Sequence, residues 1–373
     1  MLNTRGTNSV IGTGTRALAA IGVMLLAIGC NGADFSADDR ATAAPPPPDV
    51  TTTTIPTTVT TKPIAPTPEC RDGQQRVGAH VAFLVDNSNS NSDTDCPNRR
   101  RIGSLNGSDV FECGSATNRE TATLAAFDTL ARVRATAVTP GEEQALATSR
   151  MAVASFPATS NGRDGTDGWE LRTRGGWLNV DDPARRAELG SSMSFTRRPG
   201  GMTPYGAAVD AARALFRSVP DDGKAKVAVL VTDGEPTDRD PVAVAEASAD
   251  LARRGIELVT VFVTRGETRS QRVAKHTEIL RTYNTNSVNQ GRGTWFASRY
   301  QSFEAYIANL LGSNGTVSLL DRLTGRVDRS CQDTTGALCP RLTVEVADSA
   351  ALTSAFERVI TTRAISCKDS SGP

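Results

Sequence analysis

The chain has 373 residues, of which 38% are hydrophobic and 22% charged, so it can build one large globular domain or two small ones and is not a wholly disordered protein. Its 41 Lys and Arg residues balance 41 Asp and Glu residues and leave no net charge. This balance, without a basic patch interleaved with aromatic residues, argues against nucleic acid as a partner and against attraction to an acidic membrane surface.

The N-terminal segment has the features of an export signal. Arg5 and Arg16 precede the apolar run ALAAIGVMLLAIG, which ends directly before Cys30. A run of about 13 residues has the length found in signal peptides and is short for a membrane span. The small residue Gly29 before a cysteine resembles the lipobox of bacterial lipoproteins, in which the cysteine becomes the lipid-modified first residue. We therefore predict a signal peptide over residues 1–29 and lipidation of Cys30; the alternative is an ordinary secretory signal with an incidental cysteine.

The next segment, residues 30–69, has the composition of a stalk. It carries the runs PPPP and TTTT followed by IPTTVTTKPIAPTP, and it has almost no aromatic residues. Such a segment cannot bury enough apolar surface to fold, and its prolines favour an extended polyproline II conformation. At about 3.1 Å per residue it could hold a folded domain up to roughly 100 Å from the lipid. We predict a lipid-anchored, disordered linker here.

After Cys70 the pattern changes to short apolar runs that alternate with amphipathic segments, which indicates an α/β domain. The runs that we expect to be strands are VAFLV (81–85), MAVASF (151–156), KVAVLVTD (226–233) and IELVTVFV (256–263). Several are apolar on both faces, which requires helices on both sides of the sheet. Two dipeptides, Asp240-Pro241 and Thr203-Pro204, each predict a helix start, with a capping residue followed by proline in the first turn. We predict a single domain over residues 70–367 with a doubly wound, mostly parallel sheet flanked by helices, in a Rossmann-like arrangement, and a tail over residues 368–373.

Three fragments of the chain place oxygen-bearing side chains at the ends of these elements. Asp86 follows the first run, with Ser88 and Ser90 at alternate positions behind it. Asp233 ends the third run, and Thr203 lies in a loop with two glycines at a predicted helix start. Because the carboxyl ends of parallel strands meet at one edge of a sheet, we expect these side chains to converge.

Two carboxylates with several neutral hydroxyls suit a hard divalent cation, because Mg²⁺ prefers about six oxygen ligands in near-octahedral order. We predict a Mg²⁺ site, with Mn²⁺ or Ca²⁺ as alternatives, formed by Asp86, Ser88, Ser90, Thr203 and Asp233. The hydroxyls add no charge, so the ion stays electrophilic. A carboxylate from a partner protein therefore gains more there than at a site surrounded by acids.

These fragments resemble von Willebrand factor type A domains. DNSNS at 86–90 is similar to their DxSxS motif, GGMTPYGAAVDAA at 200–212 to their threonine loop, and VAVLVTDGEPTD at 227–238 to their strand ending in TDG. The resemblance covers most of residues 77–367. It implies a metal-ion-dependent adhesion site built from the predicted ligands, which would bind an acidic side chain of a partner protein. It also implies that binding can couple to movement of the last helix, here 351–363.

The sequence departs from that family in two places. Residues 91–118 intervene between the DxSxS motif and the first helix, where the family runs almost directly into a helix. Near the end, a strand-then-helix pattern is found twice, as TWFAS with SFEAYIANLL (294–311) and as RLTVEVADS with ALTSAFERVI (341–360). We take the later copy as the last unit of the fold and residues 285–340 as an insertion.

Apart from Cys30, the chain has an even number of cysteines, which suits an oxidising compartment. None forms CxxC and the chain has only two histidines, so a structural zinc site is disfavoured. Six cysteines allow 15 pairings. The pairings that we prefer are Cys96 with Cys113, Cys331 with Cys339, and Cys70 with Cys367.

Other interpretations of the polar segment are weaker. An EF-hand would need glycine and glutamate where Asn91 and Pro97 stand. A hydrolase would need a base near Ser88, but His80 lies at the other end of the same strand, roughly 20 Å away. His276 lies in a helical stretch, and the chain has neither a GxSxG elbow nor a P-loop.

We therefore expect an exported, membrane-anchored lipoprotein that faces the periplasm or the cell exterior. Its domain would be a monomeric, metal-dependent protein-binding module of the adhesion type, not an enzyme. The membrane would be contacted only through the N-terminal lipid. A metal-assisted extracytoplasmic hydrolase and a structural envelope lipoprotein with a vestigial site are the alternatives.

Overall fold

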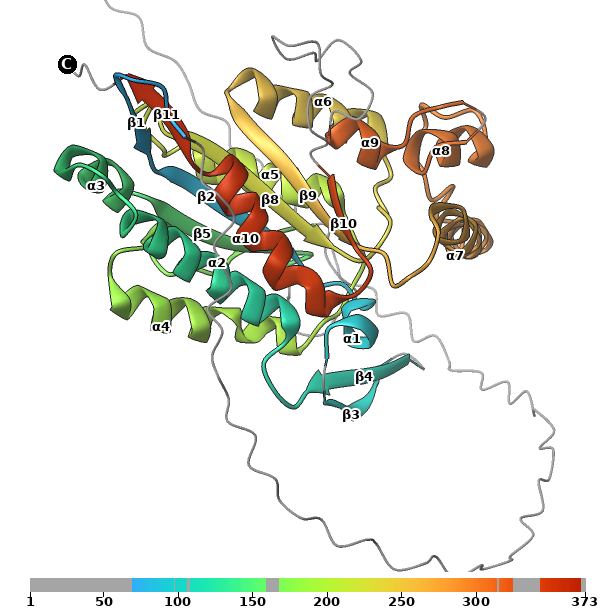
Figure 1. The fold of residues 1–373 in the computed structure, drawn as a ribbon. Helices are drawn as coiled ribbons and strands as arrows, with labels where there is room; N and C mark the ends of the chain where they lie inside the picture. Colours follow the sequence, from blue (N-terminus) through green and yellow to red (C-terminus); the bar gives the residue numbers. More distant parts are fainter. Residues whose placement is uncertain are drawn as a thin grey trace, which may run out of the picture. The chain divides into compact units, whose positions relative to one another are not determined.

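The computed structural model describes residues 69–96, 98–105, 108–158, 168–313, 315–324 and 343–369 (Figure 1). The predicted signal peptide, the lipidated Cys30 and nearly all of the predicted linker lie outside these ranges. Cys331 and Cys339, the third predicted disulfide, lie outside them as well. Among the helices in these ranges, none is long and apolar enough to cross a membrane.

The centre of the domain is a seven-stranded sheet in the order β10-β9-β8-β2-β5-β6, with β7 pairing β5 as well. Its parallel strands are β2 (Ala79–Asp86), β5 (Arg150–Phe156), β8 (Ala225–Thr232), β9 (Ile256–Val263) and β10 (Thr343–Val346). At the edge, β6 (Glu170–Leu171) and β7 (Leu178–Asn179) run antiparallel to β5. The four predicted runs all form strands, and the predicted mostly parallel sheet is confirmed.

Alternating side chains of β2 enter two separate cores, one on each face of the sheet. Phe83 packs with Phe127 and Phe356 in one core, and Leu84 packs with Tyr205 in the other. The first core is covered by α2 (Asn118–Arg134), α4 (Pro183–Ser192) and α10 (Leu352–Arg363), and the second by α5 (Tyr205–Phe216) and α6 (Pro241–Arg253). The sheet is thus doubly wound, as a strand that is apolar on both faces requires.

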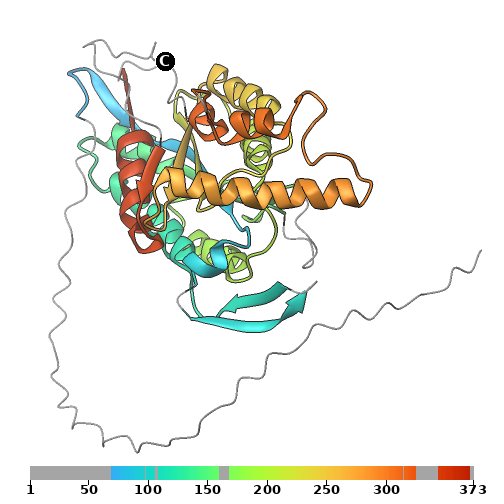
Figure 2. The same ribbon diagram turned by 90° about the vertical axis from the view of Figure 1, so that its right-hand side faces the viewer.

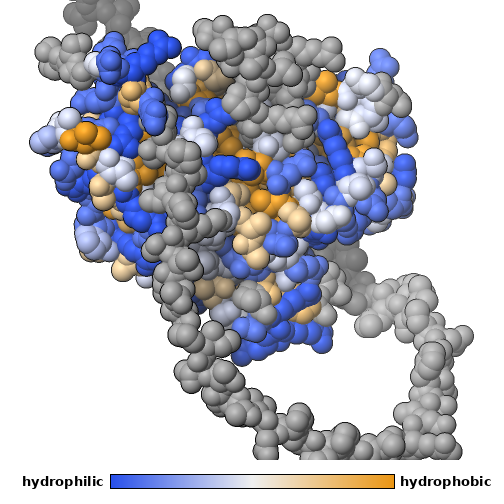
Figure 3. All heavy atoms as spheres, in the orientation of Figure 1, coloured by the Kyte–Doolittle hydropathy of each residue, from blue (hydrophilic) through white to orange (hydrophobic). Residues whose placement is uncertain are grey.

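The remaining helical segments lie in the connections. They are α1 (Asn91–Thr94), α3 (Pro140–Ala147), η1 (Met193–Arg197), α7 (Arg269–Asn289), α8 (Phe303–Leu310), α9 (Leu319–Leu323) and η2 (Ser349–Ala351). Figure 2 shows α7 side-on as one long helix. Figure 3 shows that the face seen in Figure 1 is mostly hydrophilic, with apolar residues in small groups.

One helix start differs from its prediction. Asp240 caps α6 as expected, by accepting a hydrogen bond from the backbone N–H of Ala243. Thr203 does not cap α5. The carboxylate of Asp238 does so instead, accepting from the backbone N–H groups of Tyr205 (2.8 Å) and Gly206 (2.7 Å). The hydroxyl of Thr203 is therefore not committed to the helix.

Two small antiparallel sheets carry the predicted disulfides. The first pairs β1 (Gln74–Val77) with β11 (Ser366–Asp369), and Cys70 is bonded to Cys367 beside it. The second is the hairpin of β3 (Arg99–Leu105) and β4 (Ser108–Cys113), closed by the Cys96–Cys113 bond. Both pairings are as predicted. The predicted tail boundary is wrong, because β11 continues through Lys368 and Asp369 to pair with β1.

The expected strand TWFAS is also wrong. Residues 294–298 form bends and turns between α7 and α8. Their apolar side chains pack as an aromatic cluster, with the Phe296 ring 5.3 Å from that of Tyr306 and the Trp295 ring 5.4 Å from that of Tyr283. The apolar run reflects this packing between helices, and β10 with α10 completes the sheet.

Candidate metal centre

The two predicted aspartates lie at the same edge of the sheet. Asp86 is the last residue of β2, and Asp233 directly follows β8, its parallel neighbour in the sheet. Only 1% of Asp86 and 5% of Asp233 is exposed to solvent. Two buried carboxylates at one edge need compensating donors or cations, because an isolated buried charge is strongly unfavourable.

The loop after β2 folds around these carboxylates. The backbone N–H of Ser88 donates to Asp86 Oδ1 (2.7 Å), and the hydroxyl oxygens of Ser88 and Ser90 lie 3.0 Å apart. Ser90 Oγ then donates to Asp233 Oδ1 at 2.7 Å, which joins two residues 143 positions apart. Thr232, the residue before Asp233, donates its hydroxyl to Asp86 Oδ2 at 2.7 Å. The two strand ends therefore share one hydrogen-bond network.

Backbone hydrogen bonds bring the threonine loop to the same place. The N–H of Gly200 donates to the carbonyl of Asn87 (2.8 Å), and the N–H of Asn89 donates to the carbonyl of Gly201 (3.1 Å). The TDG loop comes close to the threonine loop at Gly234. A Cβ there would lie 2.8 Å from Thr203 Oγ1 and 3.5 Å from Ser90 Oγ. The space that a side chain would take at Gly234 is thus bounded by two of the predicted ligand hydroxyls.

The structure adds a buried arginine that the sequence analysis missed. Arg119, in the first turn of α2, is 1% exposed. Its Nη1 donates to the carbonyl of Asp86 (3.2 Å), and its Nη2 lies 3.5 Å from Asp233 Oδ1. Its backbone N–H donates to the carboxylate of Asp95 (3.1 Å), which is also buried. Nothing in the sequence marked Arg119, because it lies 33 residues after Asp86 and beyond the extra hairpin.

A second missed arginine comes from the loop after β9. Arg265 Nη2 donates to Asp233 Oδ2 at 2.6 Å and to the carbonyl of Ser90 at 3.1 Å. Thr94, in α1, donates its hydroxyl to the same Oδ2 at 2.6 Å. Both oxygens of Asp233 therefore accept hydrogen bonds from the surrounding chain.

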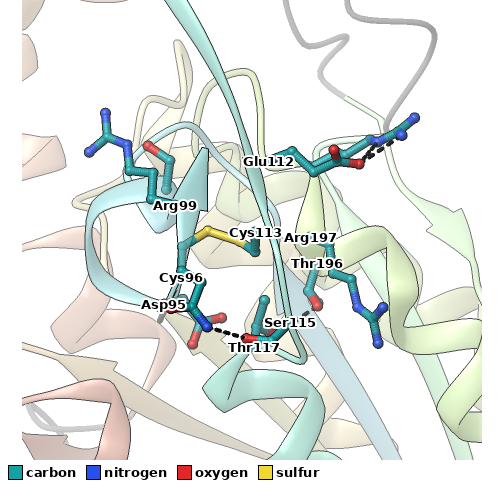
Figure 4. The surroundings of a disulfide bond; sticks show 12 residues. Asp95, Cys96, Arg99, Glu112, Cys113, Ser115, Thr117, Thr196 and Arg197 are labelled. Atoms are coloured by element: carbon teal, nitrogen blue, oxygen red, sulfur yellow. Dashed lines mark hydrogen bonds and ion pairs between the residues drawn. A yellow bond between two sulfur atoms is a disulfide. The ribbon is translucent and has the colours of Figure 1, made fainter. Parts of the chain in front are cut away.

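Figure 4 shows how the hairpin disulfide adjoins this network. Asp95 lies directly beside Cys96, at the base of the hairpin, and Thr117 lies below it at the start of α2. The hydroxyl of Thr117 lies 2.8 Å from that of Thr196 and accepts the N–H of Glu120 as the helix cap. Because the carboxylate of Asp95 accepts the backbone N–H of Arg119, the hairpin base is joined to the helix that carries Arg119.

The two aspartates have opposite pKa shifts. Burial, reinforced by the charge of Asp233, raises the pKa of Asp86 to about 6. Burial also acts to raise the pKa of Asp233, but the charges of Arg119 and Arg265 outweigh it and lower that pKa. Burial raises the pKa of Asp95. Asp86 is therefore a buried carboxylate that lacks sufficient positive charge beside it.

These residues fit a hard divalent cation. Hydroxyl and carboxylate oxygens from three loops face one edge, and Asp86 is short of a counter-charge. Within the described ranges, no group of three or more His, Cys, Asp and Glu residues could hold a metal ion. A cation here would accordingly depend on hydroxyl oxygens, which suit Mg²⁺ or Mn²⁺ better than a soft metal.

A known protein family matches part of the chain. Residues 184–290 match the von Willebrand factor type A domain. The matched segment contains Thr203 and Asp233. The doubly wound, mostly parallel sheet flanked by helices confirms the predicted fold class. The chain matches no curated protein.

Similar solved structures include a von Willebrand factor type A protein from Catenulispora acidiphila (14% identity, 77% of this chain, 45% of that chain, TM-score 0.39). The pilus adhesin SpaC from Lactobacillus rhamnosus GG is 12% identical over 78% of this chain and 31% of its own (TM-score 0.40). A proximal thread matrix protein from the mussel byssus, described with a zinc-occupied MIDAS motif, is 14% identical over 79% and 49% (TM-score 0.36). The chain spans about half or less of the length of each.

Proposed function

We propose that the chain is a metal-dependent protein-binding module, displayed on a lipid-anchored stalk outside the cytoplasm. The metal would be Mg²⁺ or Mn²⁺, held by Asp86, Ser88, Ser90, Thr203 and Asp233, with Ca²⁺ less suited to a site with few carboxylates. The partner would be a protein that presents an Asp or Glu side chain. The module would act as a monomer and without catalysis.

The observation that carries this proposal is the hydrogen bond from Ser90 Oγ to Asp233 Oδ1 at 2.7 Å. It joins the DNSNS loop to the TDG loop across two neighbouring strand ends. A polar turn with no other task would not need a hydroxyl directed at a buried carboxylate 143 residues away. The arrangement supports a site assembled for a shared ligand.

The charges of the site explain why the partner would be acidic. Three buried carboxylates (Asp86, Asp95, Asp233) face two guanidinium groups (Arg119, Arg265) and leave one formal negative charge. A bound divalent cation would turn this into one positive charge with a vacant coordination position. One incoming carboxylate restores neutrality, whereas a cationic or neutral group would leave a charge in a region of low dielectric constant.

Neither histidine is placed to act as a general base at this site. His80 is the second residue of β2, at the opposite end of that strand from Asp86, and its Nε2 lies 3.1 Å from Asp222 Oδ2. His276 lies on α7, with Nε2 2.9 Å from the carbonyl of Pro236, and burial lowers its pKa to about 4. This supports binding over hydrolysis, since general-base catalysis needs a base within reach of the substrate.

Export and lipid anchoring belong to the proposal. The two disulfides support an oxidising compartment, because such bonds persist mainly outside the cytoplasm. The lipid at Cys30 rests on the sequence alone.

The test is metal binding by variants of two aspartates from the same short stretch of the chain. Calorimetric titration with Mg²⁺ and with Mn²⁺ should give saturable binding to the wild type and none to Asp86→Ala. Asp93→Ala is the matched control, because Asp93 lies seven positions later, is exposed and pairs with Arg99 instead of the site. Equal binding by wild type and Asp86→Ala would refute the site. Capture of envelope proteins with and without chelator, using both variants, then tests for the acidic partner.

A further inference from the structure

Arg265 has an unusual backbone conformation at the metal edge. Among the described non-glycine residues it is the only one with a positive φ, at 58°. This left-handed region is unfavourable for residues with a Cβ, so the surrounding contacts must hold the residue there. In this conformation the Arg265 side chain, from the β9–α7 loop, reaches the carboxylate of Asp233.

The contacts of Arg265 join two of the predicted metal-binding loops. One nitrogen, Nη2, donates to Asp233 Oδ2 (2.6 Å) and to the carbonyl of Ser90 (3.1 Å). Its Nε is buried and has no hydrogen-bond partner. Not every N–H group of Arg265 therefore has an acceptor. Its strongest interaction is the charge-assisted hydrogen bond to Asp233.

The two arginines of the site differ in their exposure and in the element that carries them. Arg119 is 1% exposed and comes from a helix. It lies within 4.0 Å of the carboxylates of Asp95 and Asp233 and donates to the backbone carbonyl of Asp86. The side chain of Arg265 is 24% exposed and comes from a loop, whereas the side chain of Asp233 is fully buried. Arg265 is therefore the more solvent-accessible of the two cations beside Asp233.

We propose that Arg265 is a resident cation that limits the metal affinity of the site by neutralising Asp233. A fixed positive charge 2.6 Å from a ligand carboxylate repels a second cation and occupies an oxygen that the metal needs. This inference rests on the proposed metal-binding function and adds to it the residue that sets the strength of binding.

A purely structural role for Arg265 predicts the opposite change in metal affinity. If Arg265 only braced the site, its removal would loosen Asp233 and Ser90 and weaken metal binding. If it competes with the metal, its removal strengthens binding. The sign of the change separates the two roles, and a general loss of structure cannot imitate the second.

The experiment titrates Mn²⁺ alone, followed by the electron paramagnetic resonance of the free ion, into purified full-length protein. The variants are Arg265→Ala, Arg265→Gly, which suits a positive φ, and Arg265→Lys, which keeps the charge. Arg269→Ala is the matched control. It removes the same charge four residues later, where Arg269 contacts Ser318 (2.7 Å) and Asp321 (2.5 Å) instead of the site.

We expect Arg265→Ala and Arg265→Gly to bind Mn²⁺ about tenfold more tightly than the wild type, with Arg265→Lys and Arg269→Ala within about threefold of it. Equal or weaker binding by both neutral variants overturns the inference and leaves the metal site standing. Binding by the neutral variants but not by the wild type supports the inference and overturns the proposed metal-dependent function. No binding by any of the proteins overturns both.

Discussion

Glycine at position 234 has a specific role at the site. It is the residue of the TDG motif that approaches the threonine loop, and a Cβ would lie 2.8 Å from Thr203 Oγ1. A contact this short forces one of the two groups to move. Because the Thr203 hydroxyl is a proposed metal ligand, we expect its displacement to disturb the metal site and not the core.

We predict that Gly234→Ala lowers Mn²⁺ affinity at least about tenfold and costs about 1–3 kcal/mol of unfolding free energy. The measurements are Mn²⁺ titration and urea unfolding of the same preparation. Gly200→Ala is the control, because Gly200 lies in the threonine loop but has no atom within 4 Å of the added Cβ. Equal losses of Mn²⁺ affinity in Gly234→Ala and Gly200→Ala would contradict the prediction. They would mean that the effect does not come from specific displacement of Thr203.

At the residue scale the sequence predicts the oxygen donors better than the cations. Asp86 and Asp233 were placed because each ends an apolar run, and the parallel strands bring such ends together. Arg119 and Arg265 follow no pattern of spacing. They reach the site only because α2 begins beside Asp95 and because the β9–α7 loop adopts a positive φ at one residue. Neither condition is visible in the sequence.

At the scale of elements, the β3–β4 hairpin is the segment that most affects the site. Asp95 precedes Cys96, and its carboxylate accepts the backbone N–H of Arg119 at 3.1 Å. The Cys96–Cys113 bond closes a segment with a sequence separation of 17. A loop of this length gives up to about 3 kcal/mol by the chain-entropy estimate. The bond therefore restrains the residue that positions Arg119.

We predict that Cys96→Ser with Cys113→Ser lowers Mn²⁺ affinity by about three- to tenfold while the domain stays folded. Without the disulfide, Cys96 no longer restrains Asp95 and, through it, Arg119, whereas the packing of the core is unchanged. Circular dichroism checks the fold and Mn²⁺ titration checks the site. Unchanged affinity in the double variant would show that the hairpin is energetically separate from the metal edge.

The strands were predicted well and the connections poorly, for a physical reason. Strands buried on both faces leave continuous apolar runs, and β2, β5, β8 and β9 all do so. The run around Trp295 is also apolar, but it packs against helices as an aromatic cluster. A short apolar run alone cannot distinguish a strand from such packing.

For the whole molecule, the Cys70–Cys367 bond closes nearly the entire domain, with a sequence separation of 297. Closing so long a loop removes much entropy from the unfolded chain, which the loop-entropy estimate places at up to about 5 kcal/mol. We predict that Cys70→Ser with Cys367→Ser loses more unfolding free energy than the hairpin double variant and keeps Mn²⁺ affinity. Urea unfolding without reductant provides the comparison, and a smaller loss than in the hairpin variant would contradict it.

The stability of the domain should also depend on pH through His276. Burial lowers its folded-state pKa from 6.5 to about 4. The unfolded chain therefore binds a proton between these values that the folded chain does not, and the contribution of the neutral ring, full above pH 6.5, is lost as the pH falls toward 4. Raised pKa values at Glu235 and Glu257 act in the opposite direction, so the wild type alone does not isolate the effect.

The comparison with His276→Gln removes that difficulty, because glutamine can still donate to the carbonyl of Pro236 but does not titrate. We predict that the unfolding free energy of the wild type falls, relative to the variant, by about 2 kcal/mol between pH 7.5 and pH 5. Urea unfolding of both proteins at the two pH values measures this difference. If the difference in unfolding free energy between the two proteins were the same at both pH values, the pKa of His276 would lie near its ordinary value. Water would then have to reach the ring through the contact between α7 and the loop that follows Asp233.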